Sequence, residues 1–259
     1  MPIDYAAVSK ALLSGAGDLR LISVAYLQSP PPGVEKFTGV VPSGCSFWRL
    51  AHTRTHTGTH TGTTKGGFYT EPADHLNCPI GAYTHAIDLP PARASELQDT
   101  LSLMAGIGYV RLEEVPSIPR LGATPAATYY APLAETVVDP DVVIAAGRPA
   151  PLMRLQEAAA RAGAASQLPL LGRPTCMALP AAMAHGLVMS SGCIGNRVYT
   201  DLGDDELYLM IPGSRLREIA EEIAVIASAN DKLAEYHRAK KAAAPLPAAR
   251  PVDHAQKKL

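Results

Sequence analysis

A weak internal repeat is the feature that most limits how this chain can fold. The segment VAYLQSPPPGV, from Val24, matches VIAAGRPAPLM, from Val143, at an offset of 119 (143 − 24). The segment CPIGAYT, from Cys78, matches CIGNRVYT, from Cys193, at an offset of 115 (193 − 78). Since repeated units bury their apolar faces against each other, we expect two halves that pack about a pseudo-twofold axis, with like positions meeting at their interface.

The apolar patterns indicate a fold that mixes helices and strands. LRLISVAYL (19–27) and ELYLMIP (206–212) are apolar and partly β-branched, which favours buried strands. PARASELQDTLSLMAGIG (91–108) begins with proline and ends with glycines, as helices do. We therefore predict an α+β (mixed α/β) fold, with two pseudo-symmetric repeats, about 19–118 and 119–237, around a central sheet and helices packed outside.

Length favours a single globular domain over residues 1–237. A chain of 259 residues can bury roughly 75% of the surface that its unfolded form exposes, so it needs no disulfide or metal merely to fold. A long amphipathic helix is expected to start near Ser214. The last segment, 238–259, is rich in alanine, proline and lysine, which predicts a flexible C-terminal tail.

Charge and hydropathy exclude several classes of partner. The net charge is −1 and the charged fraction is 18%, which gives no electrostatic footprint for nucleic acid. No run of about 18 apolar residues is present to span a membrane, and the N-terminus lacks the basic and apolar regions of a secretory signal. We expect a cytoplasmic protein that meets a small-molecule substrate or an electron-transfer partner, and a chain this apolar also fits a homodimer.

Four cysteines are the strongest candidates for a functional site. In the cytoplasm, cysteines serve as ligands, nucleophiles or core thiols more often than as disulfides. Cys45, Cys78, Cys176 and Cys193 fall at matched positions, two in each half, and each has glycine or proline nearby. Such settings leave backbone N–H groups free to point at sulfur and stabilise a thiolate. Four such ligands could hold a 4Fe-4S cluster or, less readily, a tetrahedral zinc ion.

The spacing of the cysteines leaves other interpretations open. No C-x-x-C pair occurs, so neither a zinc ribbon nor a ferredoxin motif is present, and the ligands would have to converge through the fold. The cysteines could instead be core thiols, since cysteine is among the most buried residue types. One of them could also be a nucleophile, with His75 or His85 as its base.

Several polar residues near the cysteines are candidates for catalysis. His75 and His85 flank the second cysteine and could donate to a sulfur or move protons. Arg173, Asn196 and Arg197 lie near the last two cysteines and could bind an anionic substrate, because arginine presents a rigid donor fork to carboxylate or phosphate. The alternatives are ordinary half-buried histidines and structural hydrogen bonds to turns.

Longer motifs resemble a known family. GCSFWRLA, FYTEPADHLNCPIGAYTH, GRPTCMALPAAMA and SSGCIGNRVYTDLGDDELYLMIPG are together similar to the bacterial and archaeal family catalogued as domain of unknown function 169 (DUF169), over about residues 20–237. The resemblance implies that the cysteines belong to a shared pattern, which fits a ligand role. It implies no activity.

The segment HTRTHTGTHTGTTKGG (52–67) looks like part of a zinc finger, with His52, His56 and His60 at four-residue spacing. A zinc finger, however, needs a cysteine pair about a dozen residues upstream, and only Cys45 is there. Threonine and glycine also have low helix propensity. Members of the resembling family have a shorter connection here, so we predict an exposed, mobile insertion and no metal site.

Together these patterns predict an iron–sulfur protein with redox or lyase-type chemistry on an unknown small molecule, which would make it an iron–sulfur-dependent oxidoreductase or lyase. Its cluster would be held by four cysteines from two repeats. The alternatives are a metal-free small-molecule-binding module with core cysteines, and a structural zinc protein.

Overall fold

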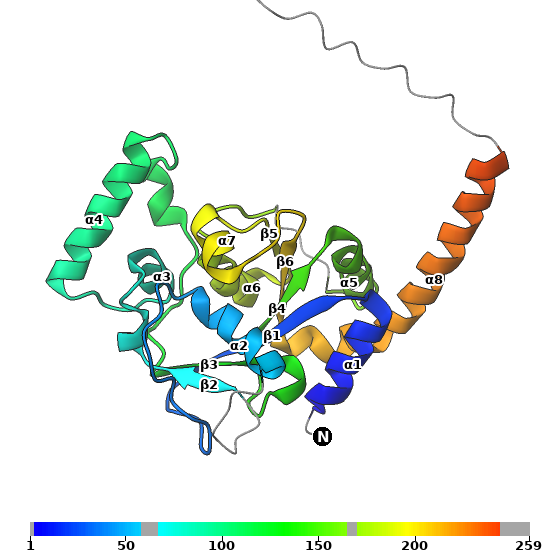
Figure 1. The fold of residues 1–259 in the computed structure, drawn as a ribbon, viewed down its shortest axis with the longest axis horizontal. Coiled ribbons are helices and arrows are strands. Elements are labelled where there is room, and N and C mark those ends of the chain that lie inside the picture. The colour runs from blue at the N-terminus through cyan, green and yellow to red at the C-terminus, as the bar shows by residue number, and fades with distance from the viewer. Residues whose placement is uncertain (1–2, 58–66, 165–169, 244–259) are drawn as a thin grey trace, which may run out of the picture.

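The computed structural model describes residues 3–57, 67–164 and 170–243, and its strands form one six-stranded sheet (Figure 1). The strand order is β2-β3-β1-β4-β6-β5, and every neighbouring pair is antiparallel. The strands are β1 Leu19–Leu27, β2 Phe68–Thr70, β3 Ala127–Pro132, β4 Val142–Gly147, β5 Val188–Ser190 and β6 Leu207–Pro212. The mixed α and β composition expected from the sequence is confirmed.

Helices lie on both sides of this sheet. The α-helices are α1 Tyr5–Ala16, α2 Ser46–Thr57, α3 Pro79–Thr84, α4 Pro91–Gly106, α5 Pro149–Arg161, α6 Ala178–His185, α7 Ile194–Thr200 and α8 Leu216–Ala243. Short 3-10 helices span Pro72–His75, Leu112–Ser117, Leu133–Glu135, Thr175–Met177 and Gly213–Arg215. Within the described ranges, no helix is both long and apolar enough to cross a membrane.

Strand β4 explains why both faces of the sheet are covered. All of its residues are buried, and successive side chains of a strand point to opposite faces. Val143 and Ala145 pack into the cluster that contains residues of α1, α5 and α8. Val142, Ile144 and Ala146 pack into the cluster that contains residues of α2 and α6. Because both alternate sets are apolar, each face of the sheet requires its own layer of helices.

The first and last helices frame the face opposite the candidate site. Helix α1 begins where the Asp4 carboxylate accepts a hydrogen bond from the Ala7 N–H at 3.0 Å, and it ends at Gly17, whose φ is 111°. Helix α8 runs to Ala243 and so extends past residue 238, where the sequence predicted the tail to begin. Residues 244–259 lie outside the described part of the chain.

Helix α2 corrects one sequence-based expectation. It continues to Thr57, so the first part of the His/Thr segment is helical although its composition predicted a loop. Its first turn contains Phe47 and Trp48, which are buried in the core. This tertiary packing orders the first turns and outweighs the low propensity of threonine. The rest of the segment, 58–66, lies outside the described residues.

Candidate functional site

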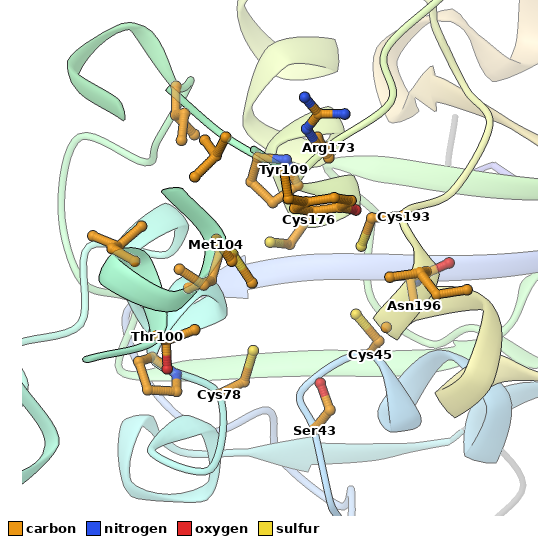
Figure 2. Close-up of a pocket in the computed structure, with 18 of the residues that line it drawn as sticks. Ser43, Cys45, Cys78, Thr100, Met104, Tyr109, Arg173, Cys176, Cys193 and Asn196 are labelled. Carbon is orange, nitrogen blue, oxygen red and sulfur yellow. The ribbon is translucent and has the colours of Figure 1, made fainter. Parts of the chain in front are cut away.

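The four cysteines line one cavity of about 370 Å³, and Figure 2 shows their side chains directed into it. All four are free thiols. Cys45 directly precedes α2, Cys78 and Cys193 are the N-cap residues of α3 and α7, and Cys176 lies in the 3-10 helix before α6. The fold therefore brings together four cysteines that are far apart in the sequence, each at the start of a helix.

Local hydrogen bonds fix two of these cysteines, Cys78 and Cys193. The Cys78 Sγ accepts a hydrogen bond from the Gly81 N–H at 3.3 Å, as the side chain of an N-cap residue does. Glycine suits position 81, because a Cβ there would lie 3.3 Å from that sulfur. The Cys193 N–H donates to the Thr175 hydroxyl. Since Thr175 directly precedes Cys176, this bond links the two cysteines of the second half.

Burial keeps two of the thiols neutral in the absence of a metal. Burial and, to a smaller extent, the nearby Cys78 raise the pKa of Cys45 to about 12, while the polar side chains of Asn196 and Ser43 oppose the rise. Burial also raises the pKa of Cys176, with smaller contributions from the other three cysteines. The thiols thus interact electrostatically with one another, and a bound cation would be needed to stabilise several thiolates here at once.

The cysteines share a cavity without forming a site for one ion. In ranges 3–57, 67–164 and 170–243, no group of three or more histidine, cysteine or acidic side chains is arranged to hold a single metal ion. A tetrahedral zinc site has Zn–S distances of about 2.3 Å, which puts its sulfurs within about 4 Å of each other. Among the described residues, no three of these thiols are therefore placed to bind one zinc ion.

Asn196 is a buried polar residue whose amide lies near Cys45 and Tyr208 without a well-formed hydrogen bond to either. Its exposed fraction is 1%, and neither atom of its amide makes a well-formed hydrogen bond. It lines the cavity on the same side as Cys45 and Cys193 in the view of Figure 2. The amide is close enough to favour the Cys45 thiolate, although no bond of good geometry joins them. A buried amide left without partners costs about 1–3 kcal/mol, which points to a ligand in the cavity.

His75 lies behind the cysteines and is neutral. Its Nε2 is 2.8 Å from the Thr70 hydroxyl, which itself donates to the Thr128 carbonyl at 3.2 Å. Nε2 therefore carries the proton and Nδ1 is the bare nitrogen. Burial, together with the nearby His85, lowers the pKa of His75 to about 3. His75 borders a narrow space that three of the cysteines, Cys45, Cys78 and Cys176, also line.

His85 borders the same narrow space with the opposite tautomer. Its Nδ1 lies 2.8 Å from the Gly81 carbonyl, which can only accept, so Nδ1 carries the proton. Its Nε2 then accepts from the Tyr26 hydroxyl at 3.1 Å. Burial lowers the pKa of His85. The two rings stack with centroids 5.8 Å apart, so both histidines are fixed, neutral neighbours of the cysteines.

The two candidate arginines have different positions. Arg173 lines the cavity, and its guanidinium carbon lies 4.5 Å from the centroid of the Tyr109 ring. Arg197 does not line it. The guanidinium of Arg197 donates to the backbone carbonyls of Ser191, Gly203 and Glu206 at 2.6, 2.8 and 3.0 Å, which is a structural role in holding the loop before β6.

Part of the cavity wall comes from a region that the cysteine pattern did not reveal. Thr100, Leu101 and Met104 of α4 line the cavity, as does Tyr109 in the following loop (Figure 2). Leu97, Leu101 and Met104 follow a helical i, i+4, i+7 spacing, which indicates one apolar face. That spacing was the available signal, but the sequence alone does not say which surface the face covers.

The fold and the cavity define a mixed α and β protein with a pocket lined by four cysteines. The model of the family described as uncharacterised ArCR, domain of unknown function 169, matches residues 19–222. The chain therefore belongs to this family.

One curated relative is itself uncharacterised. The chain is 30% identical over 158 residues to the "Uncharacterized protein MJ0308" of Methanocaldococcus jannaschii. The alignment covers 58% of this chain and 66% of that protein, so the chain spans just under two thirds of the relative's length. No solved structure matches the chain.

Proposed function

We propose that the cavity holds an iron–sulfur cluster of the 4Fe-4S type, bound by Cys45, Cys78, Cys176 and Cys193. The protein would carry out redox or lyase-type chemistry on a small molecule in the cytoplasm, where thiols stay reduced. Convergence is the observation that carries this proposal. The chain has four cysteines, and all of them line the same cavity.

The donor set fits such a cluster better than it fits one ion. Iron–sulfur clusters are held by cysteine thiolates, and the four ligands of a cubane bind four different irons, so they stand farther apart than the ligands of one zinc. This agrees with four sulfurs in one cavity that form no single-ion group among the described residues. The unpartnered Asn196 amide and the Gly81 N–H supply donors to sulfur, which tune a cluster's potential.

A cluster bound by all four cysteines would be able to transfer electrons. If one cysteine were not a ligand, the iron without a protein ligand would act as a Lewis acid. The chain's own residues would hold the small molecule. Arg173 offers a cation at the cavity wall, and Leu101 and Met104 of α4 form an apolar part of that wall. His75 and His85, both neutral and hydrogen-bonded, would keep the wall behind the cysteines rigid and uncharged.

We also propose that the cavity lies between two repeats, each contributing two cysteines. Strand pairing supports this. Strands β1 and β4 are each paired with a strand that ends in proline, Ile22 with Pro132 and Val142 with Pro212. On this pairing the boundary between the repeats lies after β3, later than residue 118. Strands β2 and β5 are the short edge strands. In each of them, the first residue pairs with the residue that lies two positions before the final proline of the neighbouring strand. The β2–β3 connection contains α4 as well as α3, whereas the β5–β6 connection contains α7 alone.

A metal-free small-molecule-binding module is the second candidate. One observation favours it: most of the cavity wall is apolar, as in ordinary ligand pockets. In this case Cys176 would be a buried core thiol and the other three cysteines half-buried wall residues.

The decisive experiment measures iron and sulfide in protein purified without oxygen. A 4Fe-4S protein is brown, absorbs broadly near about 400 nm and contains about four irons and four sulfides. Replacement of each of the four cysteines by serine should lower the iron content. Met104→Leu changes a wall residue that is not a proposed ligand, so it should leave the iron content unchanged. Iron-free protein after anaerobic reconstitution would reject the cluster, and stoichiometric zinc would support the structural zinc alternative.

A further inference from the structure

Among the described residues, one cation of the cavity wall forms no ion pair, although it is near enough to Glu114 to lower the pKa of that carboxyl. Arg173 lies over the Tyr109 ring, and among the residues that the structure describes it forms no ion pair, in contrast to Arg111, which pairs with Glu113 and Glu114. A guanidinium carries donors arranged as a fork that matches a carboxylate. The N–H donors of the Arg173 guanidinium are therefore available to a carboxylate at the edge of the cavity.

The other charged residue of the wall is already engaged. Glu114 accepts a hydrogen bond from Arg111 Nε at 2.7 Å. Arg111, and to a smaller extent Arg173, lowers the pKa of Glu114, so the carboxylate is ionised and paired. Arg111 itself does not line the cavity. A ligand would thus meet one unpaired positive charge and one carboxylate that is already satisfied.

The rest of the wall favours a hydrocarbon body. It is made mainly of aliphatic, proline and aromatic side chains, including Leu101 and Met104 of α4, Val115 and Ile118 after it, and Ile194 of α7. The volume of about 370 Å³ is in the range of small-molecule sites, about 300–1,000 Å³. Such a wall stabilises apolar surface and penalises unpaired polar groups.

We propose that the ligand of this cavity is a small monocarboxylate with an apolar body, whose carboxylate binds Arg173 and whose hydrocarbon part lies along the wall from α4. This inference rests on the proposed function, because the ligand meant is the small molecule that would reach the cysteines. A polyphosphate fits poorly, since it would bring several negative charges to a wall whose described lining residues include one arginine and no lysine.

Calorimetry with 4-phenylbutyrate and 4-phenylbutan-1-ol tests the proposal, because the two probes share a body and differ in charge. The wild-type protein should bind the carboxylate up to about fivefold more tightly than the alcohol, because Arg173 is exposed and solvent screens its charge. Arg173→Gln should abolish that preference and leave binding of the alcohol unchanged. Arg120→Gln is the matched control: Arg120 lies 4.9 Å over the Tyr83 ring but does not line the cavity, so the preference should persist.

Equal binding of the two probes by the wild-type protein, an unchanged preference in Arg173→Gln, or no saturable binding of either probe would each overturn the proposal. Iron and sulfide are measured on the same samples. Iron-free protein that keeps the carboxylate preference would reject the cluster and support the ligand class. Iron-loaded protein without the preference would reject the ligand class alone.

Discussion

The backbone N–H of Cys193 donates a hydrogen bond to the buried hydroxyl of Thr175, so the loop before α7 is tied to the 3-10 helix that carries Cys176. A donor buried without an acceptor costs about 1–3 kcal/mol. The bond therefore couples the positions of two cysteines that are 17 residues apart (193 − 176).

Thr175→Val should lower the free energy of unfolding by about 1–3 kcal/mol, because valine has nearly the same shape and cannot accept the bond. It should also reduce iron retention. Chemical denaturation and iron analysis measure the two effects. Thr175→Ser keeps the hydroxyl and serves as the control. If Val and Ser variants retain iron equally, this bond does not position the cysteines.

Stability at low pH should depend on His75. Its folded-state pKa of about 3 lies below the value of about 6.5 for an unfolded chain, so on acidification the unfolded state binds a proton first. Stability is then fully present above pH about 6.5 and falls as the pH drops towards 3, by up to about 1.4 kcal/mol per pH unit from this group. His75→Gln should flatten that slope in denaturation curves measured from pH 7 to 4. An unchanged slope would mean that His75 is protonated in the fold.

The elements that a local sequence pattern marks were predictable from the sequence. The β-branched run of β1 and the proline and glycine at the ends of α4 mark their own elements. The path of α2 was not predictable in this way, because burial of Phe47 and Trp48 orders a helix whose later residues have low propensity.

The sequence pointed to four cysteines that meet in the fold, as they do at one cavity, but it did not point to the other walls of that cavity. The matched positions of the cysteines can be read from the sequence. The direction of an arginine side chain cannot. Arg173 lines the cavity, whereas Arg197 donates to three backbone carbonyls, although both lie within four residues of a cysteine. Loop packing decides that difference, and no short-range pattern reports it.

Asn196→Leu should have opposite effects on the metal-free and the cluster-loaded protein. Leucine removes a buried amide whose atoms have no well-formed partners, so the metal-free protein should be unchanged or stabilised by about 1 kcal/mol. Loss of the donor near Cys45 should weaken cluster retention. Asn230→Leu is the contrasting control, because the Asn230 amide bonds to Glu157 and to the Ile226 carbonyl and its loss should destabilise both forms. Destabilisation of the metal-free protein by Asn196→Leu would mean that the amide is satisfied within the fold.

Helix α4 should be the least protected long helix of the chain until a ligand binds. None of its residues is buried, and in Figure 1 it stands apart from the sheet, whereas α5 buries Leu152, Leu155, Ala158 and Ala159 against the core. Helices with few buried apolar contacts open locally at low free energy. Amide hydrogen exchange should therefore be fast in α4 and slow in α5, and a saturating carboxylate ligand should slow exchange in α4 alone, because Leu101 and Met104 line the cavity. Equal protection of α4 with and without a bound ligand would show that the helix is not part of the binding site.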